Sequence, residues 1–140
     1  MNEGVAEFHG AKVAVFVGAH LVVMLRDDRD DIPFPAMWDF PGGGREGDET
    51  PEETAIRETR EETALVLEPQ DLVGKADYRT SKGNRLFFFA AHLEPDRAAG
   101  MRLGDEGQRL ELMSVEDYLD HPEAIGFMKR ELRRYLRAVG

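Results

Sequence analysis

The sequence contains no cysteine, which excludes disulfide bonds and thiolate metal sites and fits a reducing, cytoplasmic location. Its four histidines are scattered and show no paired spacing typical of zinc ligands. Positive charge is also scarce, because 18 basic residues stand against 28 acidic ones and the net charge is −10. Nucleic-acid polymers and anionic membranes are bound by basic surfaces, so we expect neither as a partner.

Long hydrophobic runs are missing as well. The most apolar stretch, residues 13–25, is too short to cross a bilayer as a helix, and Gly18 and His20 interrupt it. Its two valine- and leucine-rich halves instead predict a strand, a tight turn and a second strand. The aspartate-rich run 27–31 that follows is interpreted as a solvated connection. We expect the 140 residues to form one domain, over residues 1–140, with a core of its own.

The chain does have a glycine-rich segment followed by an acidic helix. Gly42 to Gly44 bare the backbone just before a readable helix start. Thr50 suits the N-cap, Pro51 the first helical position, and Glu53 completes a capping box with Thr50. Because no glycine or proline interrupts residues 52–63, the pattern predicts about three turns of helix.

Three glutamates gather on one face of this helix. At about 100° per residue, Glu58, Glu61 and Glu62 share one wedge of its surface, where like charges repel. One interpretation is a solvated acidic face. The other is a site for a hard divalent cation, which prefers several oxygen ligands. The preceding glycines favour the second interpretation, because bared backbone groups before a helix suit a metal or a phosphate.

This stretch resembles the signature of the Nudix hydrolases over residues 43–65. The matching positions are Gly43, Glu49, Arg57, Glu58, Glu61, Glu62 and Leu65, and the lead-in Trp38-Asp39-Phe40-Pro41-Gly42 is also similar to that of the family. Two positions depart from the signature. Thr59 replaces an aliphatic residue on what should be the inward face, and Ala64 replaces the closing glycine. If position 64 requires a positive φ, alanine there carries a strain of about 1–2 kcal/mol.

The resemblance implies an α/β fold of the Nudix αβα sandwich type, with a mixed β-sheet between helices. It also implies Mg²⁺ as the cofactor, with Mn²⁺ as a substitute. As metal ligands we expect Glu61, Glu62 and the carbonyl of Gly42 or Gly43. Glu106 is expected to complete the site, because Glu106-Gly107-Gln108 resembles a metal-binding loop of the MutT-like branch. The alternative for Glu106 is ordinary loop charge.

The same resemblance implies catalytic roles. Glu58 and Glu61 are the expected catalytic carboxylates, and Glu58 either binds metal or accepts the proton of the attacking water. Arg57 is expected to orient Glu58 through a charge-assisted hydrogen bond. Glu49 is expected as an outer or additional ligand.

Four residues are expected to contact the substrate: Gly43, Trp38, Arg79 and Arg85. Trp38 is either an aromatic wall against a nucleobase or a core residue. Arg79 and Arg85 flank a predicted hairpin turn at 81–84. They either attract a polyphosphate or are ordinary surface residues of an exposed turn.

The remaining elements follow from periodicity. The sequence predicts strands at 65–67, 72–78 and 85–93, a short helix after Ser114, and a last helix ending near 138. The apolar stripe of that helix comprises Met128, Leu132, Tyr135 and Val139. Its other faces are basic, which indicates a solvated surface in a chain of this net charge.

Together these observations predict a hydrolase of the pyrophosphate linkage in a nucleoside diphosphate joined to another group, with a nucleoside triphosphate as the preferred small-molecule substrate. Nucleotide sugars, ADP-ribose and dinucleoside polyphosphates are the alternatives within the same chemistry. A non-catalytic nucleotide-sensing module is the alternative from another class, although it predicts a damaged signature. The sequence leaves a monomer and a homodimer both open.

Overall fold

The computed structural model describes residues 7–140 and has a seven-stranded mixed sheet at its centre. The strands are β1 (Gly10–Val17), β2 (His20–Leu25), β3 (Trp38–Asp39), β4 (Gly42–Gly44), β5 (Val73–Arg79), β6 (Arg85–Leu93) and β7 (Arg109–Ser114). The helices are α2 (Pro51–Thr63), α3 (Val115–Asp120) and α4 (Gly126–Val139). Residues 1–6 of the expected domain lie outside the described residues. No helix from residue 7 onward is long and apolar enough to span a membrane.

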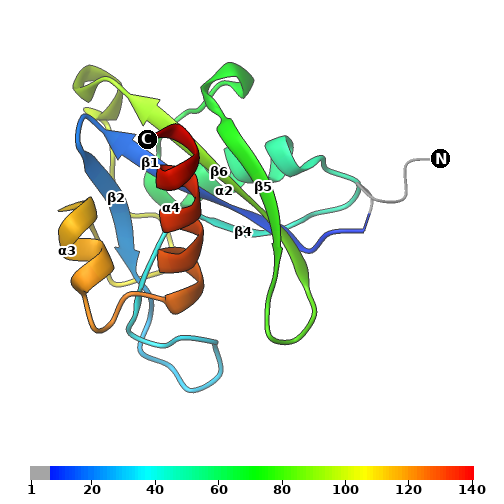
Figure 1. The fold of residues 1–140 in the computed structure, drawn as a ribbon. Coiled ribbons are helices and arrows are strands. Elements are labelled where there is room, and N and C mark those ends of the chain that lie inside the picture. Colours follow the sequence, from blue (N-terminus) through cyan, green and yellow to red (C-terminus); the bar gives the residue numbers. More distant parts are fainter. Residues whose placement is uncertain (1–6) are drawn as a thin grey trace.

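The sheet separates two apolar layers, because successive side chains of a strand point to opposite faces. On one face Val13, Val15 and Phe89 pack with Ala55 of α2. On the other face Ala14, Phe16 and Phe88 pack with Met128 and Leu132 of α4 and with Tyr118 of α3. Figure 1 accordingly shows α4 in front of the sheet and α2 behind it. The αβα sandwich predicted from the sequence is confirmed.

The strands β1 and β2 pair over only two positions, Phe16 with Leu21 and Val17 with His20, and then separate. The freed end of β1 pairs with β4, and the far end of β2 pairs with β3. The segment 38–44 therefore crosses from β2 to β1, with Gly10 opposite Gly44 and Ala11 opposite Gly43. This crossing places the glycine segment at the centre of the sheet, directly beneath α2.

The two ends of α2 follow the sequence prediction. Glu53 N donates to Thr50 Oγ1 at 3.1 Å and Thr50 N donates to Glu53 Oε1 at 2.9 Å, which completes the capping box. Beyond Thr63 the helix ends on Ala64, whose φ is +65° and whose N–H donates to the carbonyl of Arg60. Thr59 faces inward as expected, and its fully buried Oγ1 has no hydrogen-bond partner among residues 7–140.

Ala64→Gly is expected to stabilise the protein by about 1 kcal/mol, because glycine adopts a left-handed conformation without a Cβ clash. Ala64→Val should lose stability, since a branched Cβ tolerates positive φ least. Urea unfolding of both variants measures the difference. Equal stability of the glycine variant and the wild type would contradict the left-handed end of α2.

Two predictions of local structure need correction. Residues 65–67 are not a strand, because the chain leaves α2 in an irregular path that buries Leu65 and Leu67 before a 3-10 turn at Pro69–Asp71. In α4 the stripe is buried at Met128, Leu132 and Tyr135, but Val139 is 64% exposed. Whether a short apolar segment forms a strand depends on whether a neighbouring strand is available to pair with it, and a short apolar run in the sequence does not specify that neighbour.

Candidate active site

The expected metal-binding carboxylates meet in one cavity. Its lining residues are Glu46, Glu58, Glu61, Glu62, Asp105 and Glu106, and its volume is about 400 Å³. Four of these residues come from the glycine loop and α2, and two come from the loop before β7. The structure thus places Glu106 beside Glu58, Glu61 and Glu62, as the sequence predicts.

The loop before β7 reaches this cavity because it caps the C-terminus of α2. Arg102 N donates to the carbonyl of Thr63 at 2.9 Å, and Gly104 N donates to that of Glu62 at 3.0 Å. These donors satisfy helix carbonyls that have no partner within the helix. A side chain at Gly104 would collide with the carbonyl of Glu61, so only glycine allows the approach. The two residues after this contact are Asp105 and Glu106.

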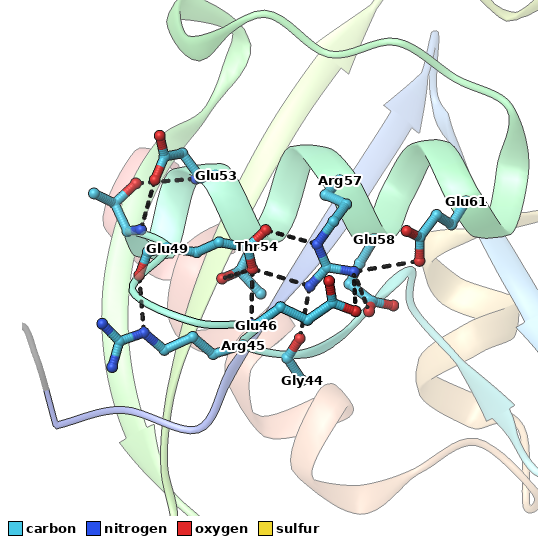
Figure 2. A network of polar contacts seen from close by, with 10 residues as sticks. Gly44, Arg45, Glu46, Glu49, Glu53, Thr54, Arg57, Glu58 and Glu61 are labelled. Atoms are coloured by element: carbon cyan, nitrogen blue, oxygen red, sulfur yellow. Dashed lines mark hydrogen bonds and ion pairs between the residues drawn. The ribbon is translucent and has the colours of Figure 1, made fainter.

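Arg57 is the centre of a polar network along α2 (Figure 2). Its Nε and Nη2 donate to the two carboxylate oxygens of Glu49, at 2.6 and 3.0 Å. Its Nη1 donates to Glu58 Oε2 at 2.8 Å and to Glu61 Oε1 at 3.3 Å, while Nη2 also donates to the carbonyl of Gly44 at 2.8 Å. This geometry supports the expected orientation of Glu58 by Arg57. Glu49 is bonded to Arg57 and does not line the carboxylate cavity, so the geometry favours the outer role for Glu49 over that of an additional metal ligand.

The environment separates the pKa values of these carboxyl groups. The hydrogen bond from Arg57 lowers the pKa of Glu49 to about 2. Burial raises the pKa of Glu58, although Arg57 opposes that effect. Burial also raises the pKa of Glu62 to about 7, even though Lys12 and the N–H of Gly42 favour its charged form. Gly42 N donates to Glu62 Oε1 at 2.9 Å.

The glycine segment is shaped by what lies against it. Gly42 has a φ of +140°, and a Cβ there would lie 2.7 Å from the Cα of Lys12. A Cβ at Gly43 would lie 2.7 Å from the Cδ of Glu58. The bare backbone of Gly43 therefore allows the Glu58 carboxylate to lie directly over it.

Gly43→Ala is expected to leave the fold nearly unchanged but to displace the Glu58 carboxylate, because the clash involves the end of a flexible side chain. We expect hydrolysis to fall by about 10²-fold, as is typical when a reacting group is misplaced by about 1 Å. Gly44→Ala is the matched control, since a Cβ there meets nothing closer than 3.9 Å. Urea unfolding and the rate of substrate hydrolysis separate the two effects. Equal rates for the two variants would contradict this role of Gly43.

The donor set fits a hard divalent cation, since the lining groups are carboxylates and one of them is buried and costly to ionise without a counter-ion. Among residues 7–140, however, no three histidine or carboxylate side chains already converge on a point where they could hold a metal ion. Arg57 accounts for part of this, because its Nη1 bonds both Glu58 and Glu61. A cation bound through Glu61 therefore competes with the 3.3 Å bond between Glu61 and Arg57.

The expected substrate-contacting residues do not gather at this cavity. Trp38 is only 5% exposed and packs edge-on against His121, which places it in the core. Arg79 Nη1 donates to the carbonyl of Gly83 at 3.1 Å, within the β5–β6 hairpin. Arg85 Nε donates to Asp77 Oδ2 of the same hairpin at 3.0 Å. Of the four, Gly43 alone touches a carboxylate of the site.

Two arginines that the sequence interpretation overlooked lie closer. Arg26 and Arg29 line a second cavity of about 180 Å³, which shares Glu62 and Glu106 with the carboxylate cavity. Arg26 directly follows β2, and Arg29 lies in the run 27–31, which the sequence predicts to be a solvated connection. That run is partly structural, because Asp27 Oδ2 accepts a hydrogen bond from Gly107 N at 3.2 Å. The sequence did contain a signal for Arg26, because this arginine directly follows an apolar segment that is predicted to be a buried strand.

The NUDIX domain family model matches residues 8–135 of the chain. An RNA pyrophosphohydrolase from Xanthomonas campestris pv. campestris (strain B100) is 54% identical over 37 residues, which are 26% of this chain and 18% of that protein. The crystal structure of the MutT protein from Methanosarcina mazei Go1 has a TM-score of 0.73 at 19% identity, over 92% of each chain. A bifunctional NMN adenylyltransferase/ADP ribose pyrophosphatase from Francisella tularensis, complexed with AMP and a Mn ion, has a TM-score of 0.76 at 18% identity, over 96% of this chain and 42% of that chain. Both structures share the fold described above.

Proposed function

This chain belongs to the NUDIX domain family, and from that premise we propose that it is a Mg²⁺-dependent hydrolase of the pyrophosphate linkage in nucleoside diphosphate derivatives, most of all nucleoside triphosphates. The observation that carries the proposal is the single cavity lined by Glu58, Glu61, Glu62 and Glu106. Mg²⁺ prefers oxygen ligands and keeps several waters, which a sparse set of carboxylates permits. We also propose that residues 1–140 act as one domain, with Mn²⁺ able to replace Mg²⁺.

The proposed metal ligands are Glu61, Glu62, Glu106 and the carbonyl of Gly42. A bound divalent cation would neutralise phosphate oxygens and lower the pKa of an attacking water. Glu58 suits the role of proton acceptor, because burial raises its pKa while its Oε2 is held by a hydrogen bond from Arg57. Arg57 holds Glu58 in place and therefore acts on the water through it.

The second cavity is the proposed position of the phosphate groups that are not attacked. Arg26 and Arg29 line this cavity together with Glu62 and Glu106, and the Arg29 guanidinium is bonded to Asp31, so an anionic chain that displaced Asp31 could bridge the cation and the arginines. This favours triphosphates over substrates whose second group is an uncharged sugar. ADP-ribose remains a second candidate, because the similar Francisella tularensis protein is described as an ADP ribose pyrophosphatase.

The test is a substrate panel with Mg²⁺, in which released phosphate, pyrophosphate and nucleoside monophosphate are measured. The panel contains nucleoside triphosphates, ADP-ribose, a nucleotide sugar, a dinucleoside tetraphosphate and a short 5′-triphosphorylated RNA. We expect the highest kcat/KM with a nucleoside triphosphate and a low one with RNA, given the net charge of −10. No hydrolysis of any member in the presence of Mg²⁺ or Mn²⁺ would refute the proposal and favour a nucleotide-sensing module.

A further inference from the structure

We propose that Asp39 is a positioning residue that holds two parts of the active site in register, the backbone of the glycine segment and the Arg26 guanidinium. Its side chain is only 3% exposed, and its Oδ2 accepts from two cations at once. Lys12 Nζ donates at 2.7 Å and Arg26 Nη1 at 3.2 Å. The other oxygen, Oδ1, accepts from Phe40 N at 2.8 Å, so both oxygens of the carboxylate are used.

One arm of this network leads to the cation site. Lys12 Nζ also donates to the carbonyls of Phe40 and Gly42, at 3.3 and 3.2 Å. On its other side Gly42 donates its N–H to Glu62 Oε1. Because Gly42 is held from both sides, the position of Lys12 sets the distance between the Gly42 carbonyl and the Glu62 carboxylate.

The other arm leads to the cavity proposed for phosphate groups. Arg26 Nε donates to the carbonyl of Pro33 at 2.9 Å, and its Nη1 is held by Asp39. Within the described part of the chain no partner is bonded to Arg26 Nη2, and this residue lines the cavity together with Glu62 and Glu106. Asp39 and Pro33 thus fix a long, rotamer-rich side chain in one orientation.

An ion pair that only stabilised the fold would not need one aspartate to bond both Lys12 and Arg26. One buried carboxylate is bonded to two cations that contact different parts of the site, the backbone of the glycine segment and the second cavity. Buried ion pairs are often replaceable by apolar groups without loss of stability, and their best supported use is to specify register. Lys12 lies in β1 and Arg26 directly follows β2, and these are the strands that separate around the glycine segment.

The inference rests on the proposed function for the role of Arg26, so the experiment also uses binding, which needs no turnover. Asp39→Asn is compared with the double variant Lys12→Met/Asp39→Asn, which removes one charge of each sign and so leaves the net charge of the site unchanged. Asp71→Asn is the control for stability, because Asp71 is partly buried and bonded to an arginine, Arg97, away from the site. Titration calorimetry with Mg²⁺ alone and with Mg²⁺ plus inorganic pyrophosphate gives both affinities for each variant.

We expect the double variant to fold and to bind Mg²⁺-pyrophosphate at least tenfold more weakly than the wild type, with a raised KM for the best substrate. Asp39→Glu, which keeps the charge, should recover part of the affinity, and Asp71→Asn should bind normally. Wild-type affinity in the double variant would overturn the proposal, even if Asp39→Asn fails to fold. A wild type that binds Mg²⁺-pyrophosphate but hydrolyses nothing would refute the proposed function and leave the test of Asp39 intact.

Discussion

Glu62→Gln is expected to abolish Mg²⁺-dependent hydrolysis. The same substitution is expected to stabilise the metal-free protein above pH 7. Glu62 is 9% exposed, and its Oε1 already accepts the N–H of Gly42. Glutamine keeps the shape and this acceptor but removes the charge that a cation needs. The loss of cation binding should lower kcat/KM by about 10³-fold or more, since metal-ion stabilisation of charge contributes several kcal/mol.

The gain in stability follows from linkage. Burial raises the pKa of Glu62 from 4.5 to about 7, so the folded protein holds its proton more tightly than the unfolded chain does. Below pH 4.5 both states are protonated and the group is not penalised. Between pH 4.5 and 7 the unfolded chain loses this proton while the folded state still holds it, so folding becomes less favourable by about 3 kcal/mol for a shift of this size, and the full penalty is present above pH 7. Glutamine does not titrate and avoids this cost.

Urea unfolding with a chelator, at pH 4.5 and at pH 8, measures the effect. We expect the two proteins to be equally stable at the lower pH and the variant to be more stable at the higher one. Mg²⁺ should reverse the order at pH 8 by stabilising the wild type alone. Glu61→Gln is the matched comparison, because Glu61 is 53% exposed and should lose activity without gaining stability. Hydrolysis untouched by both changes would refute the assignment of the site.

Arg57→Ala is expected to lose both stability and activity, with a destabilisation of about 3 kcal/mol, because it leaves part-buried carboxylates without their partner. The side chain of Arg57 is 16% exposed and bonds Glu49, Glu58 and Glu61 together with the carbonyl of Gly44. Arg57→Lys should recover little, since an ammonium cannot reproduce the bidentate contact with Glu49. Arg60→Ala, at an exposed position of the same helix, is the control.

The pH dependence of this destabilisation identifies its source. The pKa of Glu49 is lowered to about 2 by Arg57, so their interaction contributes fully above the ordinary pKa of 4.5 and is lost as pH falls toward 2. Urea unfolding at pH 7, 5 and 3.5 should therefore show the gap between the variant and the wild type narrowing only at the lowest value. A gap that is constant with pH would indicate lost packing rather than lost charge pairing.

Much of the site could be predicted because its residues lie close together in sequence. Glu58, Glu61 and Glu62 share a face through helical periodicity alone, and the start of α2 is encoded by Thr50 and Glu53. The closing glycine of the resembled signature raised the question of a positive φ at position 64, and Ala64 has one, +65°.

The unpredicted parts depend on contacts between distant segments. The burial of Trp38 and the use of Arg85 within its own hairpin are decided by which strands pair, and sequence spacing does not carry that information. Arg26 was overlooked for the same reason, since its cavity is formed by two loops about 80 residues apart that meet through Asp27 and Gly107.

By itself the sequence determined the composition of the site: which carboxylates lie on one helix face, the glycines before that helix, and hence a preference for hard cations. Only the tertiary structure decided which other groups join them. The separation of β1 and β2 opens the sheet for the glycine segment, and one buried aspartate at that opening binds a lysine of β1 and the arginine that follows β2. Local order follows from propensity and periodicity, whereas the meeting of distant charges is determined by burial, because a desolvated charge is stable only where the folded chain supplies its partner.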